Sequence, residues 1–203
     1  MTQESSFGDE SVTSALKKSI PLVNYANILT LIRLLLVPVF AGIVFAETMT
    51  PNKWWSAAGI FFAAGFTDFL DGVIARRFNL VTDLGKIADP IADKALIGTA
   101  LVALSSHGIV PWWVSVLIIS REVLVTLLRL RVLRHGVIPA SRGGKLKTFS
   151  QGFAILFYLV PSQGMINDLA HLLMYIAVGL TVITGVDYVI QARKLVNETL
   201  VNC

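Results

Sequence analysis

The chain has 203 residues, of which 55% are hydrophobic and only 15% are charged. A soluble domain of average composition carries about 25% charged residues, so this composition argues against a water-soluble protein and for an integral membrane protein. The single cysteine, Cys203, excludes an intramolecular disulfide and a zinc site built from several cysteines.

The first 20 residues are polar and mixed in charge. They contain no apolar core and no small-residue cleavage site, so we predict no cleaved signal peptide. We expect a cytoplasmic segment over residues 1–20, within which residues 11–20 form a short helix at the membrane interface.

Six segments after residue 20 are each long and apolar enough to cross a bilayer, which takes about 20 mainly apolar residues. They are residues 26–46, 54–76, 90–108, 112–133, 148–165 and 169–191. Glycine and proline mark the hinges between them. The sequence therefore predicts an all-α integral membrane protein, with one six-helix domain over 21–194 and a C-terminal tail over 195–203.

Lysine and arginine are concentrated in both terminal tails and in the loops after the second and fourth segments. The other three loops contain only Lys53. Because cytoplasmic loops are enriched in lysine and arginine, both termini are predicted to be cytoplasmic. We expect a multi-pass protein of the cell membrane, which in a bacterium is the inner membrane, with the paired tryptophans 54–55 and 112–113 at its outer interface.

Ionisable groups within apolar spans are costly, and five stand out here: Arg33, Asp68, Asp71, Arg121 and Glu122. The aspartates are the most informative. Asp68 and Asp71 are three residues apart in the second segment, so they share one helix face. Asp89 and Asp93 are four residues apart at the start of the third segment and share a face as well. Pro90 suits the first turn of a helix at that point. Two helices are thus predicted to present four carboxylates to one place on the cytoplasmic side.

Four neighbouring carboxylates repel one another unless cations lie between them. Hard divalent cations take oxygen ligands, and a pair of them can hold a diphosphate. Gly72 and Gly85 remove side chains beside the aspartates, Ala75 leaves room for a flat nucleobase, and Arg76 can contact a phosphate. Helix-capping aspartates paired with nearby basic residues, or an ion-transport path, are the alternatives that the residues alone leave open.

The segments DFLDGVIAR over residues 68–76 and GKIADPIAD over 85–93 resemble the signature of the CDP-alcohol phosphotransferase family. The resemblance implies a six-helix membrane bundle, usually homodimeric, with a cavity open to the cytoplasm. It implies two divalent ions, Mg²⁺ or Mn²⁺, bound by Asp68, Asp71, Asp89 and Asp93. It also makes Asp93 the general base for the acceptor hydroxyl. The CDP site that it implies consists of Asp68, Gly72, Ala75, Arg76 and Gly85.

Basic residues outside this motif indicate the acceptor. Arg121 and Arg129 are eight residues apart in the fourth segment, within about 80° of one another on a helix. After a loop rich in glycine and proline come Arg142, Lys145 and Lys147. These five residues are predicted to form a cationic pocket for an acceptor that carries a phosphate. Anchoring against anionic lipid is the alternative explanation of the same charges.

A second pattern resembles the phosphatidylglycerophosphate synthase branch of that family. It comprises NILTLIR over residues 27–33, Arg121-Glu122 with Arg129, and GKLKT over 144–148 with Gln151. It implies transfer of a phosphatidyl group from CDP-diacylglycerol to glycerol 3-phosphate, with Arg121, Arg129, Lys145 and Lys147 contacting the acceptor. Arg33 is expected to face the metal site or the lipid diphosphate, and Glu122 receives no role.

Two alternatives to this activity remain. The first keeps the chemistry but uses another acceptor, inositol phosphate or phosphatidylglycerol. The second is a metal-ion channel or transporter, which the near absence of ionisable residues in the outer halves of the helices opposes. The expected partners are the two substrates, membrane lipids and a second copy of the chain, without nucleic acid.

Overall fold

The computed structural model describes residues 25–78, 83–132 and 142–201, and the side chains within 31–67, 91–128 and 143–191. These residues form six helices: α2 (Tyr25–Val44), α3 (Pro51–Phe78), α4 (Asp83–Ser106), α5 (Trp112–Val132), α6 (Arg142–Leu159) and α7 (Met165–Val201). The described ranges contain no strand, so the predicted all-α class is confirmed. The interfacial helix predicted over 11–20 lies outside them.

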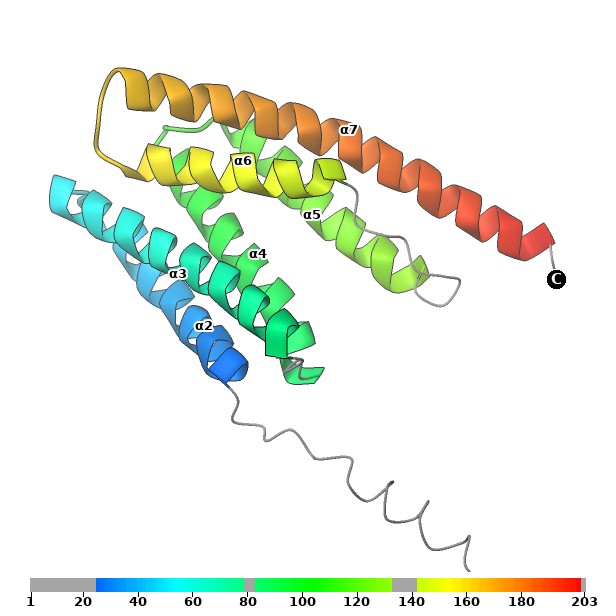
Figure 1. Ribbon diagram of the computed structural model, residues 1–203. Coiled ribbons are helices and arrows are strands. Elements are labelled where there is room, and N and C mark those ends of the chain that lie inside the picture. Colours follow the sequence, from blue (N-terminus) through cyan, green and yellow to red (C-terminus); the bar gives the residue numbers. More distant parts are fainter. Residues whose placement is uncertain (1–24, 79–82, 133–141, 202–203) are drawn as a thin grey trace, which may run out of the picture.

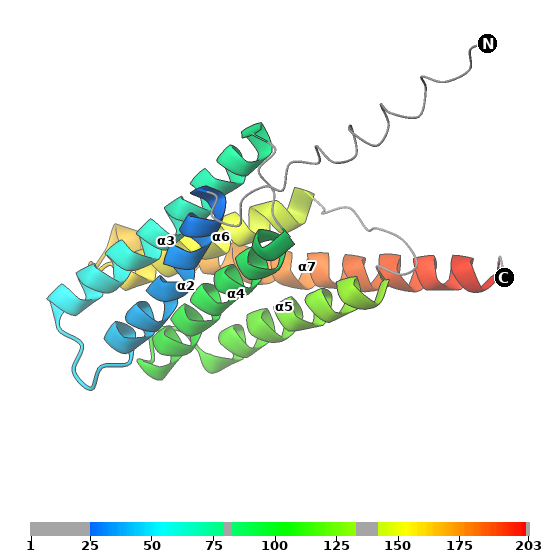
Figure 2. The same ribbon diagram turned by 90° about the horizontal axis from the view of Figure 1, so that it is seen from below.

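Successive helices run in opposite directions (Figures 1 and 2). Helices α2, α3 and α4 lie side by side, and α6 and α7 form an antiparallel hairpin. Helix α5 packs against both α4 and α7, while α3 and α4 also contact α6. The short turns after α2, α4 and α6 lie together at one end of the molecule, on the left in Figure 1. The end of α3 and the start of α4, which carry the aspartate motif, therefore lie at the opposite end.

Small residues on α3 bring the first helices close together. Ala57, Phe61 and Ala64 follow the spacing of one helix face, and all three are buried. The Phe61 ring lies 5.9 Å from the ring of Phe40 on α2. Small side chains allow close approach of helices in a membrane, where packing rather than water exclusion drives their association.

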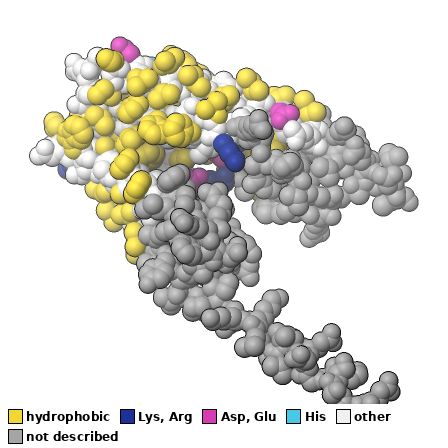
Figure 3. Space-filling model, viewed as in Figure 1, with side chains coloured by type: hydrophobic (Ala, Val, Ile, Leu, Met, Phe, Trp, Pro, Cys, Tyr) yellow, Lys and Arg dark blue, Asp and Glu magenta, His cyan; other side chains and the backbone are white. Residues whose placement is uncertain are grey.

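The outer surface of the bundle is also apolar (Figure 3). Leu35, Trp55, Trp113 and Ile183, from four different helices, are each more than half exposed. Among the described residues, one stretch, Met165–Gln191 in α7, is long and apolar enough to cross a bilayer, and α2 adds a shorter apolar stretch, Leu31–Val44. The number of spans and their orientation therefore stay predictions.

The turns confirm several hinges predicted from the sequence. Helix α3 begins at Pro51, and α5 begins directly after Pro111. Gly108 and Gly164, in the turns after α4 and α6, have φ angles of 71° and 74°. Glycine adopts this left-handed conformation without the steric cost that other residues meet.

Several helices have other boundaries than the predicted segments; α7, for example, spans Met165–Val201 where the apolar segment is 169–191. Helix α6 spans Arg142–Leu159 instead of 148–165, so Lys145 and Lys147 lie on a helix and not in the preceding loop. Helix α4 begins at Asp83, so Pro90 is not in its first turn. Hydropathy marks only the apolar part of a helix, whereas its backbone hydrogen bonds continue into polar residues, and membrane helices tolerate proline in their interior.

Candidate active site

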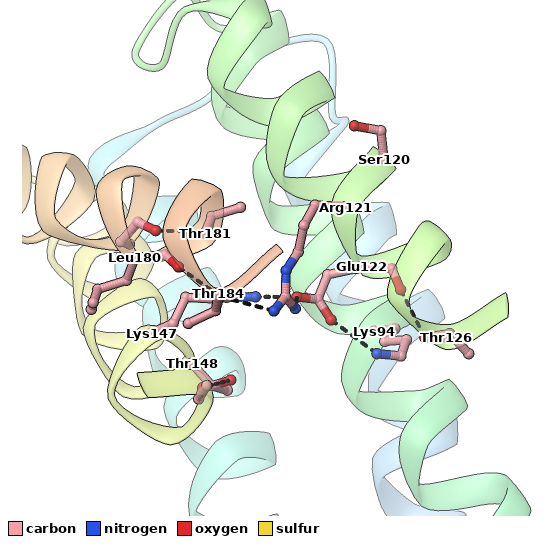
Figure 4. Close-up of polar contacts among 12 residues, drawn as sticks. Lys94, Ser120, Arg121, Glu122, Thr126, Lys147, Thr148, Leu180, Thr181 and Thr184 are labelled. Carbon is pink, nitrogen blue, oxygen red and sulfur yellow. Dashed lines mark hydrogen bonds and ion pairs between the residues drawn. The ribbon is translucent and has the colours of Figure 1, made fainter. Parts of the chain in front are cut away.

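Glu122, in the middle of α5, is the centre of a group of ion pairs that joins three helices (Figure 4). Its carboxylate accepts hydrogen bonds from Lys94 Nζ of α4 at 2.9 Å and from Arg121 Nη1 at 3.1 Å. It also accepts one from Lys147 Nζ of α6. We call these four residues the Glu122 cluster. Three positive charges against one negative charge give the cluster a formal charge of two positive units.

Lys147 is the most deeply placed cation of the Glu122 cluster. Its residue is 2% exposed, whereas the Glu122 side chain is 22% exposed. A buried ammonium is costly unless it is paired and hydrogen-bonded, and Glu122 supplies that pairing. A cation buried inside the bundle is not exposed to lipid head groups, so anchoring to anionic lipid does not explain Lys147.

The Glu122 cluster borders an open pocket between α4, α5 and α6. The pocket holds about 500 Å³ when its mouth is included. Its polar lining comprises Asp93, Lys94, Glu122, Lys147, Thr148 and Gln151. Figure 3 shows basic and acidic side chains gathered in a hollow beside the apolar surface. The pocket therefore combines Asp93, which the sequence singled out for chemistry, with Lys147, one of the five cations that it singled out for phosphate.

Gln151 adds an unsatisfied polar group to the pocket wall. It is 1% exposed, and its Oε1 has no hydrogen-bond partner among the residues described. A buried amide oxygen without a partner is unfavourable, and the energy is recovered when a donor arrives. A hydroxyl of a ligand in the pocket would be such a donor.

Arg121 does not line the pocket, but it donates a hydrogen bond to Glu122, which does. Its Nη1 shares the Glu122 oxygen that Lys147 also contacts, and its Nη2 donates to Thr184 Oγ1 of α7 at 2.9 Å. Lys145, which the sequence assigned to the same pocket, is exposed. Two residues apart on a helix, Lys145 and Lys147 face different directions, so the structure separates these two predicted contacts.

Arg33 is 1% exposed on α2. Helix α2 packs against α3 and α4, the two helices that carry the aspartate motif. A buried guanidinium at this position fits an internal site better than a surface anchor. The predicted contact between Arg33 and the lipid diphosphate is not tested by this placement.

Several predicted site residues have side chains outside the described part of the structure. They are Asp68, Asp71, Gly72, Ala75 and Arg76 on α3, Gly85 and Asp89 on α4, Arg129 on α5, and Arg142 at the start of α6. Among the side chains that are described, no three or more aspartate, glutamate, histidine or cysteine residues lie close enough together to hold a metal ion. The metal and CDP sites therefore stay predictions.

Sequence reasoning missed three members of this arrangement. Glu122 had been noticed as an ionisable residue within a span, and that cost was itself a signal of a role. The sequence alone gives Lys94 no role. Nothing in the sequence connects Thr184 with Arg121, because the contact joins residues 63 positions apart.

Comparison with known proteins covers both the aspartate motif and the Glu122 cluster. Residues 23–183 match the family model described as CDP-alcohol phosphatidyltransferase. The chain is 50% identical over 177 residues to a protein of Mycobacterium tuberculosis named probable phosphatidylglycerophosphate synthase, covering 85% of this chain and 83% of that protein.

Two further relatives differ in the names they carry. The CDP-diacylglycerol–glycerol-3-phosphate 3-phosphatidyltransferase of Bacillus subtilis is 36% identical over 181 residues, which cover 82% of this chain and 94% of that protein. The CMP-forming cardiolipin synthase of Streptomyces coelicolor is 34% identical over 178 residues, which cover 84% and 83%. Since the family model extends from before α2 into α7, the chain belongs to the CDP-alcohol phosphatidyltransferase family, as its aspartate motif predicted.

Proposed function

We propose that this protein transfers the phosphatidyl group of CDP-diacylglycerol to sn-glycerol 3-phosphate, releasing CMP and forming phosphatidylglycerophosphate. Membership of the family and the names of the two most similar relatives described above support this activity. The structural observation that carries the choice of acceptor is the buried Lys147, which lines a pocket together with Asp93. The phosphate of a phosphate-bearing acceptor would pair with this buried ammonium group.

The acceptor phosphate would bind near Lys147 and Lys94, which both line the pocket. Lysine offers a compact positive charge, while the planar guanidinium of Arg121 behind Glu122 adds charge and fixed donors. Arg129, Arg142 and Lys145 are proposed as further contacts of the acceptor. The Gln151 amide would contact a glycerol hydroxyl, which a phosphate ion alone does not offer.

The transfer itself would need a base beside the acceptor hydroxyl. Asp93 would take the hydroxyl proton while the oxygen attacks the β-phosphorus of CDP-diacylglycerol. A new oxygen–phosphorus bond forms, and the bond to CMP breaks with its electron pair remaining on CMP. Arg33 would hold the lipid diphosphate, and Gly72, Ala75, Arg76 and Gly85 would hold the CDP moiety with Asp68.

A carboxylate donor set suits divalent metal ions, which this family generally uses. Asp93 lines the pocket, and Asp89 lies one turn earlier on α4. Together with Asp68 and Asp71 they would hold two ions, Mg²⁺ or Mn²⁺. Bound there, the ions neutralise charge on the diphosphate, which is the main electrostatic demand of phosphoryl transfer.

Members of this family are membrane-bound, and the apolar exterior of the bundle is consistent with lipid around it. We propose one domain over 21–194 with six spans in the cell membrane, both termini in the cytoplasm and the pocket open to that side. The distribution of lysine and arginine between the loops supports this orientation. A homodimer is proposed from the family resemblance.

Purified protein in detergent, supplied with CDP-diacylglycerol and Mg²⁺, is expected to release CMP with glycerol 3-phosphate. Inositol, inositol phosphate and phosphatidylglycerol serve as competing acceptors, the last because one relative is named a cardiolipin synthase. EDTA is expected to abolish release, and added Mg²⁺ or Mn²⁺ to restore it. Release with phosphatidylglycerol and with no other acceptor would contradict the assignment of glycerol 3-phosphate as the acceptor. Release in the presence of EDTA would contradict the proposed metal dependence.

Gln151→Ala is expected to raise the KM for glycerol 3-phosphate about tenfold, since one buried hydrogen bond to the substrate is lost. The KM for CDP-diacylglycerol should change much less. Thr148→Ala is the matched control, because Thr148 lines the same pocket and its hydroxyl donates to Gly144 O at 3.1 Å. Equal effects of the two substitutions would remove Gln151 from acceptor recognition.

A further inference from the structure

Helix α7 reaches the Glu122 cluster through Thr184 and Gly185, although the sequence of this helix had suggested only a membrane span. Thr184 is 7% exposed, and its Oγ1 accepts a hydrogen bond from Arg121 Nη2 at 2.9 Å. Arg121 in turn donates to Glu122, which pairs with Lys147. A continuous chain of polar contacts therefore connects α7 to the pocket cation (Figure 4).

The Thr184 hydroxyl is oriented by its own helix. It donates to the Leu180 carbonyl oxygen at 2.6 Å, so its single proton is committed and its lone pairs are available to Arg121. Thr181, almost one turn earlier, makes the same bond to the Ala177 carbonyl oxygen at 2.6 Å. No contact of Thr181 with a charged group is found in the described part of the chain, so it serves as an internal comparison.

Two glycines supply the space for this contact. A Cβ atom added to Gly185 would lie 3.3 Å from Arg121 Cγ and 3.8 Å from its Nε. A Cβ atom added to Gly143, in the first turn of α6, would lie 3.0 Å from the methyl group of Thr184. The absence of a side chain at Gly185 thus leaves space for the aliphatic part of Arg121. The absence of one at Gly143 leaves space for Thr184, which accepts the hydrogen bond from the Arg121 guanidinium.

Arg121 has donor capacity beyond these contacts. A guanidinium carries five N–H groups, and its bonds to Glu122 and Thr184 use one each of Nη1 and Nη2. Its Nε is buried and has no partner among the residues described. Fixing the stem and one edge of a guanidinium reduces the entropy that it loses when an anion binds.

We propose that Thr184 and Gly185 of α7 are positioning residues for the acceptor site: they fix Arg121, and through it Glu122 and Lys147, in the geometry that receives the acceptor phosphate. This inference rests on the proposed function for the location of the phosphate. It assigns to α7 a part in substrate affinity, in addition to its part in the membrane.

The test compares Thr184→Val with Thr184→Ser and Thr181→Val in the CMP-release assay, using whichever acceptor supports release. Valine keeps the shape of threonine and removes only the hydroxyl. Thr184→Val is expected to raise the acceptor KM about tenfold, the effect of losing one hydrogen bond to a charged group, with kcat and the KM for CDP-diacylglycerol nearly unchanged. Thr184→Ser and Thr181→Val should behave like the unchanged protein.

A double-mutant cycle separates positioning from a general structural effect. In an Arg121→Ala background, Thr184→Val is expected to have no further effect on the acceptor KM, because the contact is already absent. Gly185→Ala, whose added Cβ meets the Arg121 stem, should raise the acceptor KM in the same direction as Thr184→Val. Melting temperatures in detergent identify any variant that is simply unfolded.

Three results would overturn the inference. They are equal effects of Thr184→Val and Thr181→Val, a full effect of Thr184→Val in the Arg121→Ala background, and a parallel loss of kcat and of affinity for both substrates. Failure of glycerol 3-phosphate as an acceptor for the unchanged protein would overturn the proposed function instead. The KM for the acceptor that does support release would still decide the role of Thr184.

Discussion

Asp93→Asn is expected to lower the rate of CMP release about a thousandfold, which is within the range that general bases contribute. Asparagine keeps the size of aspartate but does not accept a proton at neutral pH. Asp93 lines the pocket beside Lys94, so the substitution acts where the acceptor hydroxyl would lie. CDP-diacylglycerol is expected to bind still, because the amide oxygen can replace one carboxylate oxygen toward a cation. The measurement is single-turnover CMP release together with the increase in melting temperature caused by CDP-diacylglycerol.

The matched control is Asp187→Asn on α7. Asp187 is an exposed aspartate whose carboxylate accepts a hydrogen bond from Gln191 at 2.8 Å, so its loss should leave turnover unchanged. Turnover that persists in Asp93→Asn would eliminate Asp93 as the base. Loss of CDP-diacylglycerol binding together with turnover would assign Asp93 to holding the diphosphate rather than to proton transfer.

The aspartate motif shows what the sequence could predict. The spacing of Asp68, Asp71, Asp89 and Asp93 is local, and local spacing on helices is fixed by helix geometry. Apolar segments and Gly/Pro hinges likewise predicted all six helices, because each depends on residues close together in the chain. The family followed from that motif alone.

The Glu122 cluster shows what the sequence could not predict. Lys145 and Lys147 were given one role because both are basic and nearly adjacent, but α6 turns only Lys147 inward. That difference depends on where α6 begins, which hydropathy placed six residues too late. Glu122 and Thr184 gain their partners only when α4, α5, α6 and α7 are packed together, since no pattern along the chain encodes which faces will meet.

Lys147→Met is expected to raise the KM for glycerol 3-phosphate about a hundredfold, a loss of the size expected when a charged hydrogen-bonding group is removed from a buried site. Methionine fills much of the same volume, so the change removes charge without leaving a large cavity. The Glu122 carboxylate keeps Lys94 and Arg121 as partners, which limits the damage to folding. The formal charge of the Glu122 cluster falls from two positive units to one, and the affinity for a phosphate-bearing acceptor falls with it.

Lys145→Met is the comparison that distinguishes a direct contact made by a buried lysine from a long-range effect of positive charge. Both substitutions remove one positive charge from the same helix, but Lys145 is exposed whereas Lys147 is buried against Glu122. A cationic site that acts at long range would lose similar affinity from either change, and the loss would diminish as salt is added. A site that depends on direct contact loses affinity mainly from Lys147→Met, and salt changes the ratio between the variants little. Equal KM values for the two variants, or an equal effect of Lys147→Met on both substrates, would place Lys147 outside the acceptor pocket.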